Sequence, residues 1–169
     1  PVHLGVAASL GLTHLPVTRR PVVAIVSTGD EIIEPGENLR PGTIYNSNAS
    51  TIGGMVLRHG GIPKIVGTAL DTEDSLNIAL DRAMDADLVL TSAGVSKGDY
   101  DVVKLVLASR GEIVNKLVRM KPARPLAFGT FKAADDRIIP HLGLPGNPVA
   151  VVVAFEAFAR PAILAMQGK

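Results

Sequence analysis

Acidic residues follow each of the first three apolar runs of the sequence, a placement that can build a metal or phosphate site. If the runs are neighbouring parallel strands, their carboxyl ends meet at one edge of a sheet, where ligands bind in such folds. The pattern therefore predicts a cluster of carboxylates drawn from distant parts of the chain. The runs and their acids are residues 22–27 with Asp30 and Glu31, residues 63–70 with Asp71, and residues 87–92 with Asp99 and Asp101.

Taken singly, each of these acids has an ordinary structural explanation. Aspartate is common in turns and at the first residue of helices, and Asp71 could simply cap a helix that begins at Thr72. Three acidic positions in register at one edge are harder to explain in this way. We therefore favour the functional interpretation.

Two glycine-containing loops, at residues 94–98 and 143–148, each lead into an expected helix. Backbone N–H groups at such positions bind anions, and Mg²⁺ combines one or two carboxylates with phosphate oxygens. The acidic residues and the two glycine-containing loops together therefore indicate a site that binds Mg²⁺ and a phosphorylated ligand. Neither loop matches a P-loop or a dinucleotide-binding fingerprint, so glycine content alone does not establish nucleotide binding.

Lys97, Lys121 and Arg124 are the cations nearest these loops. Two prolines stiffen the stretch at 121–125 and could preorganise its charges to hold an oxyanion. An ordinary solvated turn is the simpler alternative for this stretch. The four histidines show no metal-ligand spacing, and no histidine adjoins the candidate serine and threonine nucleophiles, which argues against a Ser–His–Asp hydrolase.

The elements that must position these residues alternate between strand and helix. Three strand–helix units come first, and they imply a parallel sheet with right-handed crossovers. A hairpin or β-ribbon is expected next, then a strand, and then an apolar helix with Pro148 in its first turn and a kink at Pro161. The fold class is α/β: a three-layer α/β/α domain with a mostly parallel sheet and a small β-hairpin. The later segments are residues 112–118, 125–131, 137–142 and 148–159.

Composition excludes several classes of protein. With 47% apolar residues in 169 the chain can bury a core, and with a net charge of +1 and no tryptophan it lacks the features of a nucleic-acid partner. Cysteine is absent, so thiolate chemistry and disulfides are excluded. A membrane partner is not expected either, because Glu156 and Arg160 interrupt the longest apolar run.

The start of the chain, Pro1, is followed by an apolar segment at residues 2–15 that predicts a short helix without the basic start of a signal peptide. We expect residues 1–18 to be the end of a preceding linker helix. Residues 19–169 would form one domain, excised from a longer protein; a processed natural start is the alternative.

Five ordered motifs resemble the molybdenum insertase (molybdopterin molybdenumtransferase) family, specifically its central molybdopterin-binding domain. The resemblance runs from about residue 19 to residue 168, and it implies a molybdopterin-binding-domain-like fold. Related adenylyltransferases usually have Gly-Gly-Thr-Gly where this chain has Ala-Gly-Val-Ser at 93–96, and Ser in place of Asn147, so the insertase branch is preferred. The motifs are STGDE at 27–31, GTIYNSN at 42–48, TSAGVSKGDYD at 91–101, KPARPLAFG at 121–129 and LPGNP at 144–148.

The resemblance implies roles for particular residues. The catalytic acids would be Asp30, Glu31, Asp71 and Asp101, with Asp71 and Asp101 as metal ligands. Ala123 and Arg124 stand where the family usually has Gly and Lys, which leaves the anion contact there open. The substrate-binding residues would be Thr28, Gly29, Ser92, Gly94, Ser96, Gly98, Asp99, Lys121, Arg124, Pro145, Gly146, Asn147 and Pro148.

The implied reaction is Mg²⁺-dependent insertion of molybdate into adenylylated molybdopterin, with release of AMP. A cytoplasmic homodimer is expected. Two alternatives stay open at this point: a molybdopterin adenylyltransferase, and a non-catalytic pterin-binding module. The excised domain could also be inactive by itself.

Overall fold

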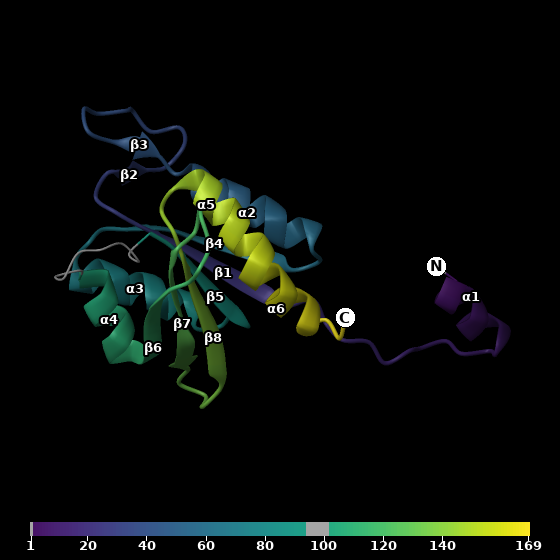
Figure 1. Cartoon of the computed structure of the whole chain (residues 1–169). Helices are drawn as coiled ribbons and strands as arrows, with labels where there is room; N and C mark the ends of the chain where they lie inside the picture. Colours follow the sequence, from purple (N-terminus) through teal and green to yellow (C-terminus); the bar gives the residue numbers. More distant parts are fainter. Residues whose placement is uncertain (1, 94–101) are drawn as a thin grey trace.

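A six-stranded mixed sheet forms the centre of the computed structural model, which describes residues 2–93 and 102–169 (Figure 1). The strand order is β4-β1-β5-β8-β7-β6, with parallel pairing from β4 to β8 and antiparallel pairing of β7 with both neighbours. The mostly parallel sheet is thus confirmed, and the expected hairpin, β6–β7, extends this sheet. The strands are β1 (Val22–Thr28), β4 (Ile62–Ala69), β5 (Leu88–Ser92), β6 (Gly111–Leu117), β7 (Pro125–Lys132) and β8 (Ile138–Leu144).

Helices cover both faces of the sheet and complete the three layers (Figure 1). One face carries α2 (Ser47–Arg58) and the C-terminal helix, and the other carries α3 (Glu73–Ala83) and α4 (Val102–Arg110). Strand β1 is buried on both sides, and its alternate residues Val23 and Ala24 enter the two different cores. This double burial is the reason for the continuous apolar run.

Side-chain caps start helices α2 and α3, and also α5. The Asn46 side chain accepts a hydrogen bond from the Ala49 N–H at 3.1 Å and begins α2, while Thr72 begins α3. The cap of α3 is therefore Thr72, and the alternative role for Asp71 as that cap is wrong. For helix α4 the sequence predicts one apolar face with Val102, Leu105 and Val106, but the helix buries Val106 and leaves Leu105 63% exposed.

The C-terminal helix runs without a break through α5 (Pro148–Ala154), a π-helical stretch η1 (Phe155–Ala159) and α6 (Arg160–Ala165). Pro161 falls in the first turn of α6, directly after the π-helical stretch. Among the described residues, this helix is long and apolar enough to cross a membrane, contrary to the interruption expected at Glu156 and Arg160. Its apolar composition has a local cause, since Phe155 and Ile163 on one face are fully buried against the sheet.

A second, two-stranded parallel sheet lies in the Pro- and Gly-rich segment after β1. It pairs β2 (Ile32–Ile33) with β3 (Ile44–Tyr45), and in Figure 1 it stands beside the start of α2 and α5. This sheet was not expected from the sequence. The N-terminal helix α1 (Val2–Ser9) is shorter than the helix expected over residues 2–15, and it is set apart from the sheet by an extended segment (Figure 1).

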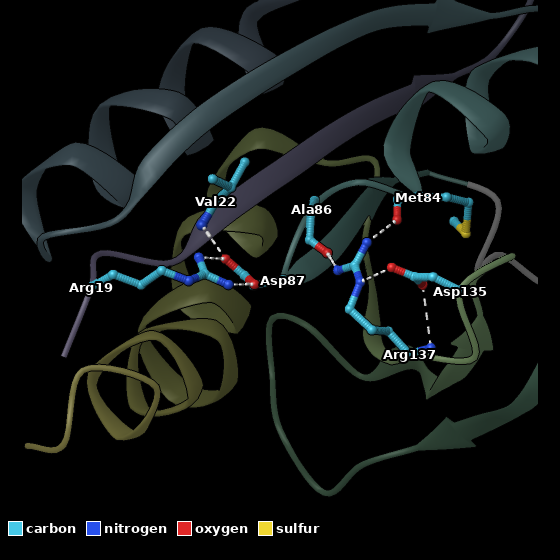
Figure 2. Close-up of polar contacts among 7 residues, drawn as sticks. All are labelled: Arg19, Val22, Met84, Ala86, Asp87, Asp135 and Arg137. Atoms are coloured by element: carbon cyan, nitrogen blue, oxygen red, sulfur yellow. Dashed lines mark hydrogen bonds and ion pairs between the residues drawn. The ribbon is translucent and has the colours of Figure 1, made fainter.

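A polar clamp, defined as Arg19, Asp87, Asp135 and Arg137, closes the amino-terminal edge of the sheet (Figure 2). Asp87 accepts hydrogen bonds from the Arg19 guanidinium and from the Val22 N–H, and these contacts hold the pKa of Asp87 below its usual range. Arg137 donates to Asp135 at 2.6 Å and to two carbonyl groups of the α3–β5 turn. Within the clamp, the Arg19–Asp87 contact joins the end of the N-terminal segment to the residue that precedes β5.

Candidate functional site

A cavity of about 130 Å³ opens at the carboxyl ends of β1 and β5. It lies where helix α2 and the C-terminal helix, which starts with α5, both begin, so segments far apart in sequence surround it. Both polar side chains, with hydroxyl and amide groups, and apolar side chains line it. The lining residues are Ser27, Thr28, Glu31, Ile32, Ile44, Tyr45, Asn46, Ser47, Asn48, Ser92, Ala93, Gly146 and Pro148.

The loop after β1 brings two of the expected acids together. The Asp30 carboxylate accepts a hydrogen bond from the Asp71 N–H at 2.9 Å, although the two residues are 41 positions apart. Gly29 allows this sharp turn with a φ of 139°, and a Cβ there would lie 2.7 Å from the Glu31 carboxylate. Glu31 itself lines the cavity. The Asp30 carboxylate and the Asp71 backbone thus meet at this edge next to Glu31, and the catalytic and metal-binding roles of these acids stay predictions.

Five of the expected site residues lie outside the described part of the chain: Gly94, Ser96, Gly98, Asp99 and Asp101. Their relation to Asp30 and Asp71 stays a prediction. Within residues 2–93 and 102–169, no three or more His, Asp or Glu side chains are grouped closely enough to hold a metal ion.

The loop at residues 144–148 contains Asn147, the N-cap residue of α5. The Asn147 side chain accepts hydrogen bonds from the N–H groups of Val149 and Ala150, at 3.0 and 3.2 Å, so it starts α5 and does not line the cavity. Gly146 does line it, and a Cβ there would lie 3.3 Å from the Cβ of Ala93. Bare backbone at Gly146 keeps this side of the cavity open.

Lys121 and Arg124 lie in the β6–β7 loop, at the same edge of the sheet. Because β7 runs antiparallel to β8, with Ala127 opposite Gly143, the start of β7 lies beside the carboxyl end of β8. The loop surrounds a shallow hollow of about 680 Å³ that shares no lining residue with the cavity. Ala123, where the family usually has Gly, has a φ of 73° in the left-handed region that favours glycine.

Asn46 and Asn48 are site residues that the sequence reasoning missed. The Asn48 amide donates to the Ser92 hydroxyl at 2.9 Å and to the Gly146 carbonyl at 2.8 Å, which joins the ends of three elements. Asn46 caps α2, accepts from the Ser27 hydroxyl, and donates to Thr68. Both residues lie in the motif at 42–48. Their position at the cavity depends on hydrogen bonds to residues distant in sequence, which the motif alone does not indicate.

His141 is a buried titratable group on β8, beneath this edge. Its Nε2 lies 3.1 Å from the Thr91 hydroxyl, its ring lies 5.1 Å from that of Phe131, and burial lowers its pKa from 6.5 to about 4. This geometry fits the structural role expected for a histidine without a carboxylate partner.

The depressed pKa of His141 predicts a loss of stability in mild acid. Above pH 6.5 the histidine is neutral in both states; between pH 6.5 and about 4 the unfolded chain takes up a proton that the folded chain excludes. The free energy of unfolding should fall by about 3 kcal/mol across this window. Urea titrations at several pH values would measure the fall. The variant His141→Gln should flatten the curve, and an equal fall in that variant would contradict the assignment.

Comparison with known proteins identifies the family of this chain. A family model described as a probable molybdopterin binding domain matches residues 24–165. Molybdopterin molybdenumtransferase from Nostoc sp. is 39% identical over 98% of this chain and 38% of its own length. Molybdopterin molybdenumtransferase 2 from Mycobacterium tuberculosis is 41% identical over 99% of this chain and 42% of its own length. The chain spans about two-fifths of the length of these curated relatives.

Solved structures give the same result. The molybdopterin biosynthesis MoeA protein from Pyrococcus horikoshii superposes with a TM-score of 0.82 at 30% identity, covering 97% of this chain and 40% of that one. The tungsten cofactor synthesizing protein MoaB from Pyrococcus furiosus shares the fold alone, with a TM-score of 0.64 at 16% identity over 92% of this chain and 100% of that one. Family model, relatives and fold agree with the motif resemblance: the chain belongs to the molybdopterin-binding domain family.

Proposed function

We propose that this chain provides the substrate site of a molybdenum insertase in molybdenum cofactor biosynthesis. The site takes adenylylated molybdopterin and molybdate with Mg²⁺, and the products are molybdenum cofactor and AMP. Support for the insertase branch comes from the curated molybdenumtransferases, which match at 39–41% identity, whereas the MoaB structure matches at 16%.

One observation carries the proposal: the carboxylate of Asp30 contacts the backbone of Asp71 across 41 residues, beside a cavity lined by Glu31. Acidic residues that separate segments bring to this edge would favour the binding of a divalent cation. They also lie near loops with exposed backbone, where a phosphorylated ligand is expected. The arrangement suits a phosphoanhydride held between carboxylates and glycine loops.

The donor set fits Mg²⁺, because these acids offer carboxylate oxygens and the chain contains no cysteine. Asp71 and Asp101 would hold the ion, and Asp30 and Glu31 would be the further acids of the site. When bound, Mg²⁺ would polarise the phosphoanhydride and shield its negative charge. The chain's own residues orient the ligand: Gly146 leaves room for it, and Lys121 and Arg124 place positive charge at the same edge for its anionic groups.

Binding measurements test the carboxylates directly. Adenylylated molybdopterin would be titrated into the 169-residue chain with and without Mg²⁺, for the wild type and for Asp30→Asn, Asp71→Asn and Asp136→Asn. We expect Mg²⁺ to tighten binding in the wild type, and each of the first two variants to lose about tenfold in affinity when Mg²⁺ is present. Asp136 lies in the β7–β8 turn at the opposite edge, so Asp136→Asn removes the same charge and should bind as the wild type does.

Equal Mg²⁺-dependent affinity in all four proteins would contradict the proposal. AMP release in the presence of molybdate is the second readout. Mg²⁺-dependent release would support the insertase activity, whereas tight binding without release would support the non-catalytic pterin-binding module. ATP-dependent adenylylation of molybdopterin would support the adenylyltransferase instead. The homodimer and the cytoplasmic location stay predictions.

A further inference from the structure

We infer that the small β2–β3 sheet is an apolar subsite for the flat face of a planar nitrogen heterocycle, with Ile32 and Ile44 as the contact residues. This inference rests on the proposed function, because adenylylated molybdopterin carries two such ring systems, a pterin and an adenine. The subsite would select for flat fused rings and would leave the phosphate to the acidic edge.

The strand register places both isoleucines on one face. Ile32 lies opposite Ile44 in the parallel pair, so their side chains share a face, and both residues line the cavity. Ile33 points to the other side and is 5% exposed, within the core. Ile44 is 58% exposed although it is apolar and β-branched. A flat ligand would cover this apolar surface.

Main-chain and side-chain hydrogen bonds fix the sheet before any ligand arrives. The N–H of Ile44 donates to the Glu31 carbonyl at 2.8 Å, and the N–H of Asn46 donates to the Ile33 carbonyl at 2.8 Å. The Asn46 amide then donates to the Glu34 carboxylate at 3.0 Å, which holds the start of the following loop. A subsite that is already ordered loses little conformational freedom on binding.

Polar groups that line the same cavity suit the edge of such a ring. The Ser92 hydroxyl accepts a hydrogen bond from Asn48, so its own hydrogen is available to a ring nitrogen or carbonyl oxygen. Ser47 also lines the cavity. An apolar wall with a few convergent polar groups is typical of sites that bind planar organic ligands.

The test measures dissociation constants for adenylylated molybdopterin, for a simple pterin and for AMP, each titrated separately into the full chain. Ile44→Ser should weaken binding of the whole ligand about tenfold, because it removes most of the apolar contact. Ile44→Val should change binding less than about threefold. Ile138→Ser is the matched control: Ile138 is 61% exposed, begins β8 at the opposite edge, and should leave affinity unchanged. Circular dichroism melting would confirm that each variant is folded.

The two smaller probes identify which ring lies on the subsite, since only that probe should lose affinity in Ile44→Ser. If the wild type binds adenylylated molybdopterin and Ile44→Ser binds it equally well, the inference is wrong and the proposed function stands. If the wild type does not bind adenylylated molybdopterin, both are overturned.

Discussion

Replacing Phe155 by alanine should destabilise the domain by about 3–5 kcal/mol. Phe155 is fully buried at the start of the π-helical stretch, and its ring stacks on that of His59, with centroids 6.1 Å apart. It belongs to the core between the sheet and the helices α2 and α5, so its removal leaves a cavity among the buried residues of that core. The free energy of unfolding from urea titration would measure the effect.

Phe128→Ala is the matched control for this prediction. Phe128 lies on β7 and is 42% exposed, so the same truncation removes less buried surface. We expect a loss of about 1 kcal/mol. Similar losses in the two variants would show that burial of Phe155 is not what stabilises this core.

Replacing Gly129 by alanine should cost about 3 kcal/mol or more and should loosen the edge strand β6. A Cβ at Gly129 would lie 1.9 Å from the carbonyl oxygen of Glu112 and 2.9 Å from the Cα of Ile113. Both are backbone atoms of the paired strand, which cannot rotate away, so β6 and β7 must separate at this point. Urea titration would measure the loss of stability, and faster amide hydrogen exchange in β6 would locate it.

Gly54→Ala supplies the contrast within the same chain. Gly54 lies in α2, and a Cβ there would meet nothing within 4 Å. Because glycine disfavours the interior of a helix, this variant should be more stable by about 0.5–1 kcal/mol. A destabilised Gly54→Ala together with a neutral Gly129→Ala would contradict the packing described for both elements.

Local sequence signals predicted most of the framework. The β-branched run at residues 22–27 belongs to the strand buried on both faces, and α3 starts at its cap Thr72, where the sequence predicted the start of a helix. Such elements depend on the pattern of a few adjacent residues. Glycine and proline at 143–148 likewise marked the turn into α5, where Pro148 occupies the first turn.

The parts that were missed depend on contacts between distant residues. The β2–β3 sheet has two residues in each strand, too few for a periodic pattern, and it forms because Ile44 pairs beside Ile32 across a Pro- and Gly-rich loop. Asn48 donates to Ser92 and to Gly146, which lie 44 and 98 positions further along the chain, and no local sequence pattern indicates such contacts. The apolar residues of α4 were assigned to the wrong face because Leu105 suits either side of a short helix by composition.

The polar clamp lies at the amino-terminal edge of the sheet, and the cavity lies at the carboxyl edge, at the other end of the domain. Arg19 anchors the outgoing segment at Asp87, and a Cβ on Gly168 would lie 3.6 Å from the Thr18 hydroxyl, so both ends of the chain emerge at the pole opposite the cavity (Figure 1). Tethering this domain to a sensor chip or a fluorescent fusion through either terminus would therefore leave the ligand entrance facing solvent.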